Sequence, residues 1–285
     1  AESREKMTFL EFAPLLSGKK FISSCFVRNG KPAEEPAVWG MTVRSAGSMR
    51  FRWNEENPAR EKLLSEIAGT CSVVPVQLDH TKIVYLIEEK CDTFQKIGDG
   101  LITRNRNLMP VVTVADCMPL YFSDNETGFF GIVHSGWKGT GIAAEAVSLA
   151  VEKYGARREN ISVAIGAHIR SCCYIVNKER ADYFSRNFTE DCVSLLREGE
   201  VPCEGVPVSW NNGSGPLFRL SLEKANLAVL AKAGIRDENI VVSKDCTCHN
   251  PEFGSNRRET ASGTEFTVQA AFVKREDSAG VMGGV

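Results

Sequence analysis

Short apolar runs and longer amphipathic stretches follow one another along the chain and predict both strands and helices. Runs rich in β-branched residues predict strands at residues 72–78, 82–87, 111–115, 128–134, 160–166, 239–243 and 264–273. Apolar residues three and four positions apart predict helices at 58–68, 142–155 and 178–188, and at 221–234 between a capping serine and a glycine. Because strands occur both in clusters and between helices, we expect an α+β fold whose mixed sheets are covered by helices.

The stretch between residues 199 and 216, GEVPCEGVPVSWNNGSGP, is the most irregular part of the chain. A helix and two strands are expected after it, so it is typical of a long loop or lid rather than of a boundary between domains. We therefore expect residues 1–285 to form a single domain.

The composition of the chain favours a small molecule over a nucleic acid or a membrane surface as its binding partner. The chain is 43% hydrophobic and 25% charged with a formal net charge of −2, which does not provide the basic field of nucleic-acid or membrane-surface proteins. Residues 1–16 carry charges among their apolar positions, unlike a secretory signal, and no apolar run is long enough to span a bilayer. Scattered cysteines favour reduced thiols, so we expect a cytoplasmic protein that binds a small molecule, with its oligomeric state open.

The most distinctive local motif is IVHSGWKGTGIAAEA. A strand is predicted to end at His134, followed by Gly136, Gly139 and a helix start. Backbone amides at a helix start, with Lys138 nearby, can bind an anion, and the missing Cβ of a glycine lets the anion approach. The spacing matches neither the dinucleotide-binding nor the phosphate-loop motif, so a tight turn with a solvated lysine is the alternative.

Four residues that can carry chemistry interrupt predicted strands or follow them directly. Asp116 and Cys117 separate two apolar runs, where a buried carboxylate needs a partner. His80 lies in another such break, and His134 ends a strand. An acid–thiol pair of this kind suits a metal or nucleophile site, whereas a turn aspartate beside an inert core cysteine is the alternative. The histidines lie 37 and 17 positions from Cys117, so only the fold can assemble a shared site.

Other polar motifs have simpler interpretations. The CTCH segment at 246–249 does not have the C-x₂₋₄-C spacing of a zinc knuckle, and no second half-site is evident, so a loop of small thiols is favoured. The vicinal pair at 172–173 can oxidise, although adjacent side chains more often point in different directions. Arg257 and Arg258 can bind phosphate or carboxylate bidentately, although surface arginines are usually solvated.

Five segments in order along the chain resemble the YfiH-like family, also called laccase-domain proteins or multicopper polyphenol oxidoreductases. Members of that family have been reassigned as zinc-dependent purine nucleoside phosphorylases with adenosine deaminase activity. The resemblance implies a fold of α/β/β/α layers and covers the chain from about residue 70 onward. The segments are GDGLIT at 98–103, TVADCMPLYF at 113–122, IVHSGWKGT at 132–140, IGAHIRSCCYIV at 165–176 and CTCHNPEFGSNRRETASG at 246–263.

The resemblance implies a set of metal ligands. The family binds its metal through the histidine of a Q-x-H segment, the cysteine of ADC and the histidine of HxGW[KR]G, which correspond to His80, Cys117 and His134. Here two residues separate Gln77 from His80 instead of one, and the family's GPxxGPCCY is replaced by GAHIRSCCY. Two histidines, one thiolate and an open fourth position suit a catalytic zinc, with copper as a possible substitute.

The remaining residues are then assigned by the chemistry of phosphorolysis. Phosphate must lie beneath the ribose C1′, and the glycine-rich helix start with Lys138 and the arginine pair can bind it. Asp116 can order a ligand or accept a substrate hydroxyl. We therefore expect a zinc-dependent phosphorylase acting on adenosine, inosine, guanosine or methylthioadenosine with phosphate, with adenosine deaminase activity. The phosphate-binding residues on this hypothesis are Gly136, Lys138, Gly139, Arg257 and Arg258.

Three other functions remain open. A copper-dependent polyphenol oxidase with a blue-copper centre and a coupled cluster needs more imidazoles than the four histidines present. A cysteine hydrolase, or an enzyme that edits peptidoglycan precursors, can use Cys117 as nucleophile and His134 as base without a metal. The ten cysteines also fit a non-catalytic metal- or redox-binding protein.

Overall fold

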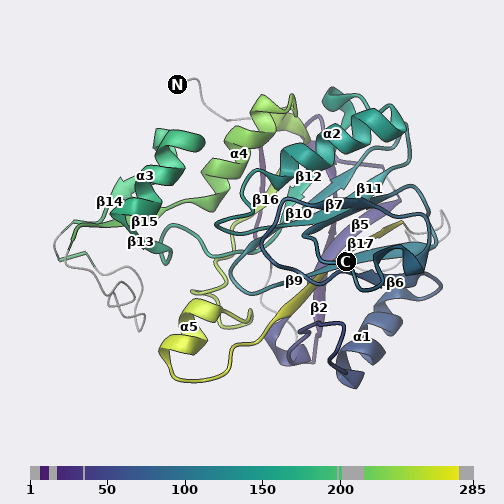
Figure 1. The fold of residues 1–285 in the computed structure, drawn as a ribbon. Coiled ribbons are helices and arrows are strands. Elements are labelled where there is room, and N and C mark those ends of the chain that lie inside the picture. Colours follow the sequence, from purple (N-terminus) through teal and green to yellow (C-terminus); the bar gives the residue numbers. More distant parts are fainter. Residues whose placement is uncertain (1–6, 13–17, 35, 198, 201–214, 276–285) are drawn as a thin grey trace.

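The computed structural model describes residues 7–12, 18–34, 36–197, 199–200 and 215–275. Two large sheets pack face to face, and helices cover their outer faces (Figure 1). Among the described residues, no helix combines the length and the apolar character needed to cross a membrane.

The larger sheet has seven strands and contains both parallel and antiparallel pairs. Strands β10 and β11 form an antiparallel hairpin at its centre, with β12 parallel to β16 on one side and β8 parallel to β7 on the other. In spatial order the strands are β1 (Thr8–Leu10), β16 (Ile240–Ser243), β12 (Ser162–Ile165), β10 (Met118–Ser123), β11 (Phe130–Ser135), β8 (Gly100–Thr103) and β7 (Val84–Leu86).

The second large sheet has five strands, and two small sheets lie beside the large ones. The five strands are, in order, β2 (Phe21–Cys25), β5 (Ala37–Thr42), β17 (Gln269–Arg275), β9 (Leu108–Val114) and β6 (Ser72–Pro75). The small sheets are β13 (Ile175–Asn177), β15 (Leu217–Leu220) and β14 (Val193–Leu195), and the pair β3 (Val27–Arg28) and β4 (Lys31–Pro32).

Side chains of the same strand alternate between cores because successive residues point to opposite faces of a sheet. In β10, Leu120 and Phe122 pack against α2 and α4, whereas Tyr121 packs between the two sheets. In β17, Val273 faces the other sheet and Phe272 packs on α1. The strands therefore have apolar side chains on both faces, which explains why their sequences form continuous apolar runs. The layers are α2 and α4, the seven-stranded sheet, the five-stranded sheet, and α1.

Four of the α-helices in the described part of the chain begin at a residue whose side chain caps them, whereas α2 follows Gly141 without a side-chain cap. Asn57 begins α1, Asn177 begins α3, Ser221 begins α4 and Ser255 begins α5, each accepting a backbone N–H bond three residues onward. The five helices are α1 (Pro58–Ala68), α2 (Ile142–Tyr154), α3 (Lys178–Asn187), α4 (Leu222–Lys232) and α5 (Asn256–Ala261).

The α+β class with mixed sheets is confirmed, and the four helices predicted from spacing are present. The strand expected at 264–273 begins later, at Gln269, and continues to Arg275. Helix α5, the strands before residue 58, and the strands β8, β13, β14 and β15 were not predicted from the sequence. Most of the irregular stretch at 199–216 lies outside the described residues, and the assignment of the whole chain to one domain stays a prediction.

Candidate metal centre

The topology brings the three predicted ligands to one end of the seven-stranded sheet. His134 lies near the end of β11, and Pro119 of β10 is its partner in the antiparallel register, so Cys117 emerges directly beside it. Strand β8 pairs with the other side of β11, and β7 pairs with β8, which brings the loop carrying His80 to the same edge. The three residues are far apart in the sequence, and the pairing of four neighbouring strands is what brings them together.

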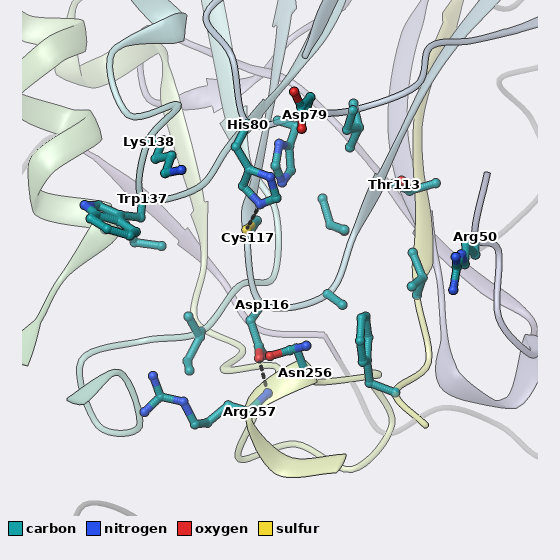
Figure 2. A pocket seen from close by; sticks show the side chains of 18 of the residues that line it. Arg50, Asp79, His80, Thr113, Asp116, Cys117, Trp137, Lys138, Asn256 and Arg257 are labelled. Carbon is teal, nitrogen blue, oxygen red and sulfur yellow. Dashed lines mark hydrogen bonds between the residues drawn. The ribbon is translucent and has the colours of Figure 1, made fainter. Parts of the chain in front are cut away.

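The donor atoms of His80, Cys117 and His134 all lie within 4.8 Å of one another. The Cys117 Sγ is 3.9 Å from the His80 Nε2, and the two imidazole rings meet edge to face with centroids 4.9 Å apart. His134 is buried, Cys117 is partly exposed and His80 is exposed. One side of the cluster is thus closed by the sheet and the other is open (Figure 2).

Asp99, which directly precedes β8, holds both histidines. Its Oδ1 lies 2.8 Å from the His134 Nδ1 and accepts the backbone N–H of His80 at 3.1 Å. Its Oδ2 accepts the backbone N–H and the hydroxyl of Thr81, each at 2.7 Å. Because Nδ1 of His134 faces the carboxylate, Nε2 is the ring atom left for a metal. Asp99 is completely buried, so these donors are the compensation for removing its charge from water.

Charges within the site reinforce one another. Burial opposes ionisation of the Cys117 thiol, but the charge of His134 and hydrogen bonds from both histidines lower its pKa to about 6. Burial also opposes protonation of His134, but the Cys117 thiolate and the Asp99 carboxylate raise the pKa of His134 to about 10. Without a metal, the two side chains therefore form a thiolate–imidazolium pair, and the sulfur is already in the ligating form.

Tight backbone geometry allows the ligands to approach one another. A Cβ placed on Gly136 would lie 2.7 Å from the Cys117 Sγ and 3.1 Å from the His80 Cδ2. Gly139 is also close-packed, since its Cβ would lie 3.0 Å from the Thr81 carbonyl oxygen. Gly136 and Gly139, in the turn between β11 and α2, are therefore in contact with the loops that carry the candidate ligands, and their role in anion binding stays a prediction.

Asp116 points away from the three metal donors. Its Oδ2 accepts the backbone N–H of Arg257 at 2.6 Å (Figure 2), and its Oδ1 accepts the hydroxyl of Thr247 at 2.7 Å. The backbone at Asp116 has a φ of 78°, a left-handed conformation that is uncommon for a residue with a side chain. Asp116 therefore ties the turn that carries Cys117 to the start of α5.

A cavity of about 660 Å³ opens beside the cluster. Its wall includes the three donor residues and Asp116 (Figure 2), together with aromatic rings and cationic side chains. The rings are those of Phe51, Trp137, Tyr174 and Phe266, and the cations are Arg50, Arg52, Lys138, Arg180 and Arg257.

Arg180 of α3 is a cavity residue that the sequence analysis missed. Its guanidinium lies 3.8 Å above the centre of the Trp137 ring, and its Nη1 lies 3.4 Å from the Tyr174 hydroxyl. The buried Nε of Arg180 has no hydrogen-bond partner among the described residues. A buried N–H donor of this kind calls for an acceptor, and the cavity is where one can be supplied.

The two arginines singled out in the sequence have different surroundings. Arg257 lies in the cavity wall, and its guanidinium donates to the Ile175 carbonyl oxygen at 3.2 and 3.3 Å. Arg258 is not part of that wall; its guanidinium donates to the carbonyl oxygens of Thr247 and Cys248. Lys138 is exposed at the cavity rim. The structure thus brings Lys138 and Arg257 to the cavity and leaves Arg258 bracing a loop.

A sequence profile of the family described as multi-copper polyphenol oxidoreductase laccase matches residues 55–271. The chain belongs to this family. The match covers the three donor residues, Asp99, Arg180 and the start of α5, whereas the cavity residues Arg50, Phe51 and Arg52 lie just before it.

Several relatives in the laccase family carry names that state an activity. The purine nucleoside phosphorylase YlmD of Geobacillus stearothermophilus is 34% identical over 182 residues, 63% of this chain and 61% of that protein. The purine nucleoside phosphorylase LACC1 of Homo sapiens is 30% identical over 289 residues, 93% of this chain and 61% of that protein. Adenosine deaminase RL5, from an unknown prokaryotic organism, is 32% identical over 175 residues, 59% of this chain and 60% of that protein. The chain spans about three-fifths of the length of these relatives.

The solved structure of YlmD has the same fold. It superposes with a TM-score of 0.69 at 26% identity, covering 89% of this chain and 97% of that chain. The family assignment and the mixed α+β architecture thus agree between sequence and structure.

Proposed function

We propose that the chain is a metal-dependent purine nucleoside phosphorylase that also deaminates adenosine at the same site. The observation that carries this proposal is the convergence of His80, Cys117 and His134 beside a cavity lined by aromatic rings and cations. The activities named for the laccase-family relatives support the same conclusion.

Zinc suits the donor set. Two imidazole nitrogens and one thiolate leave a fourth position open, as in catalytic zinc sites. Ordinary zinc bond lengths place nitrogen and sulfur donors about 3.5 Å apart on a tetrahedral ion, close to the 3.9 Å between His80 Nε2 and Cys117 Sγ. Asp99 behind His134 is the carboxylate partner that commonly orients a ligating histidine. When bound, zinc supplies Lewis acidity to a substrate oxygen or to water.

Phosphate fits the cationic part of the cavity. In phosphorolysis an oxygen of phosphate bonds to ribose C1′ while the bond to the purine nitrogen breaks and its electron pair leaves with the base. Arg180, Arg257 and Lys138 can hold the phosphate at that stage. The Nε of Arg180 has no acceptor among the described residues, and the guanidinium of Arg257 places positive charge in the cavity wall.

The purine fits the aromatic part of the cavity. A flat base can stack on an exposed ring, and the amide of Asn256 at the start of α5 can both donate to and accept from a purine edge. Asp116 is a positioning residue in this scheme, because it holds the start of α5 against the Cys117 turn.

The donor count favours this function over copper-dependent polyphenol oxidation. Two of the four histidines lie in the cluster, whereas the buried His168 donates from Nδ1 to the Gly166 carbonyl oxygen of its own loop at 2.8 Å. One such site holds a single ion, whereas a coupled copper cluster needs several more imidazoles.

One geometric feature favours a second candidate function. This candidate is a metal-independent cysteine hydrolase, whose substrates could include peptidoglycan precursors. Cys117, His134 and Asp99 stand in the order nucleophile, base and orienting acid, with the His134–Asp99 contact at 2.8 Å. Hydrolysis of an amide or ester by this route would persist after a chelator removes the metal.

Product analysis tests the proposal. The protein, with its metal content measured, is incubated with adenosine or inosine, with and without phosphate. Free base together with ribose 1-phosphate, formed only with phosphate, is the expected result, along with inosine from adenosine. His80→Ala should abolish both reactions. Absence of turnover, with amide hydrolysis that survives chelation, would establish the cysteine hydrolase instead.

Arg180 provides a test of the phosphate site. Arg180→Met keeps the chain length near Trp137 but removes every N–H donor, so KM for phosphate should rise at least tenfold while binding of the nucleoside changes little. Arg186→Met, on the exposed side of the same helix, is the matched control and should leave both constants unchanged. Equal effects of the two substitutions would remove Arg180 from the site.

A further inference from the structure

A second group of thiols lies apart from the candidate metal centre. The Sγ atoms of Cys172, Cys173 and Cys246 are all within 4.8 Å of one another, and Cys172 and Cys173 are 3.6 Å apart. The Cys248 thiol hydrogen-bonds with Cys173 and lies at the edge of this group. The vicinal side chains therefore point the same way, and the loop segment CTC supplies the second half-site that is not evident along the sequence.

We infer that this thiol cluster, Cys172, Cys173, Cys246 and Cys248, is a second metal site for a thiophilic d¹⁰ cation, Zn²⁺ or Cu⁺. Thiolate sulfurs are the preferred ligands of both ions. Zinc–sulfur bonds of about 2.3 Å place the sulfurs of a tetrahedral site about 3.8 Å apart, which the Cys172–Cys173 separation of 3.6 Å matches.

Deep burial means that the cluster can hold thiolates only where nearby groups offset their negative charge. Cys173 is 0% exposed and Cys248 is 2% exposed, so negative sulfur here needs local compensation. The backbone N–H of Arg170 donates to the Cys246 Sγ at 3.3 Å, the type of bond that stabilises a metal-bound sulfur.

Three guanidinium groups surround the same segments. Arg219 donates to the Cys172 carbonyl oxygen at 3.2 Å, Arg257 to that of Cys173 at 3.5 Å and Arg258 to that of Cys248 at 3.0 Å. Three or four thiolates around one or two positive charges leave a net negative complex, and these arginines place positive charge against it. Arg258 would therefore both hold its loop in place and offset the negative charge of the metal–thiolate complex.

The second metal would cross-link two loops. Cys172 and Cys173 belong to the loop before β13, whereas Cys246 and Cys248 belong to the loop after β16, and residues 168 and 246 already form a β-bridge. Thr247, between the two loop cysteines, donates to Asp116 beside the first site. The inference does not depend on the proposed function, because the thiol cluster shares no donor with the first site.

Metal content per chain tests the inference. The full-length protein, purified under reducing conditions, is loaded with zinc, desalted and measured by elemental mass spectrometry. We expect two zinc ions per chain in the unsubstituted protein and one in Cys172→Ser/Cys246→Ser. His80→Ala/Cys117→Ala should lose the other ion. Cys71→Ser/Cys192→Ser, one partly exposed and one buried cysteine outside both groups, is the matched control and should keep two.

The outcomes separate the two sites. A single ion that disappears in His80→Ala/Cys117→Ala but persists in Cys172→Ser/Cys246→Ser overturns the second site and leaves the proposed function standing. A single ion with the reverse pattern overturns the first site only. A parallel loading with Cu⁺ tests the other ion, and binding of neither zinc nor Cu⁺ at the thiol cluster overturns the inference.

Thiol labelling of the unsubstituted protein covers the case in which the double variant does not fold. Maleimide is applied to native protein with and without zinc, and the labelled peptides are identified by mass spectrometry. The partly exposed Cys172 should be labelled at least tenfold more slowly with zinc, whereas the exposed Cys91 should be labelled equally in both samples. Equal labelling of Cys172 with and without the metal overturns the inference.

Discussion

At the scale of single residues, one buried carboxylate links two of the three candidate ligands. Asp99 accepts from the His134 ring and from the backbone of His80, so its position sets both imidazoles relative to each other. The donors around Asp99 come from different strands and loops, and their hydrogen bonds offset the cost of burying the charge. Metal affinity should therefore be sensitive to Asp99 although it is not itself a ligand.

Asp99→Asn tests this link. The amide nitrogen must face either the pair His134 and His80 or the two donors of Thr81, so one group of donors loses its acceptor. Metal affinity should fall about 10- to 100-fold, measured by competition with a chelating dye. Asp124→Asn, a buried aspartate at the other end of the β10–β11 hairpin, should leave affinity unchanged. Equal losses in the two variants would show general destabilisation instead.

Gly136→Ala tests the close approach of the loops. The added methyl group would lie 2.7 Å from the Cys117 Sγ, so sulfur and imidazole must separate and metal binding should weaken by at least tenfold. Circular dichroism should report an intact fold. Gly215→Ala, where no atom lies within 4 Å of the new methyl group, is the control, and retention of full affinity in Gly136→Ala would contradict the geometry.

At the scale of elements, a buried tyrosine hydroxyl connects the two large sheets. Tyr121 of β10 is fully buried between them, and its hydroxyl donates to the Gly40 carbonyl oxygen of β5 at 3.0 Å. Burial raises the pKa of Tyr121 well above its usual value, so the hydroxyl stays protonated and available as a donor.

Tyr121→Phe should therefore lower the free energy of unfolding by about 1–3 kcal/mol, because the buried Gly40 carbonyl loses a donor. Urea denaturation measures this change, and metal affinity should stay constant. Tyr85→Phe removes a hydroxyl that donates to the exposed Ile97 carbonyl oxygen and should cost less, because water can replace it. A larger loss in Tyr85→Phe would contradict the assignment.

Elements with a strong local signal were predictable from the sequence. Helix α1 has Pro58 in its first turn, an apolar stripe and a following glycine, and its bounds were predicted at 58–68 as observed. Helix α5 was missed, because its six residues carry charged side chains that read as solvent-exposed, whereas burial of Arg257 and Glu259 stabilises it in the fold. Short helices of this kind depend on tertiary contacts rather than on periodicity.

The candidate site was predictable only in part, because some of its residues are also brought into place by tertiary contacts. Cys117 and His134 stand at strand ends, which the sequence shows, and the resemblance supplies His80. Asp99 lies within the quoted GDGLIT segment, but nothing local shows that its carboxylate faces His134. Arg180 gives no local signal at all, because stacking on Trp137 arises from the approach of α3 to a distant loop.

At the scale of the whole molecule, a metal at the first site would join three parts of the chain: the loop before β7, the turn before β10 and the end of β11. Binding to the folded chain but not to the unfolded one raises stability by mass action. Adding zinc to metal-free protein should therefore raise the melting temperature, which differential scanning calorimetry measures. His80→Ala should remove the share of the increase that comes from this site. His249→Ala, another exposed histidine, should keep the full increase, and an equal effect of both substitutions would contradict the assignment.

The placement of His80 on a loop also has a kinetic consequence. Cys117 and His134 are joined to β10 and β11, which belong to two hydrophobic cores and can open only if both cores open. His80 is exposed and anchored mainly through Asp99, so its loop can swing outward while the strands stay closed. Metal exchange should then proceed through release of this one ligand, and residues 77–83, rather than the strands, would set how long an ion resides in the site.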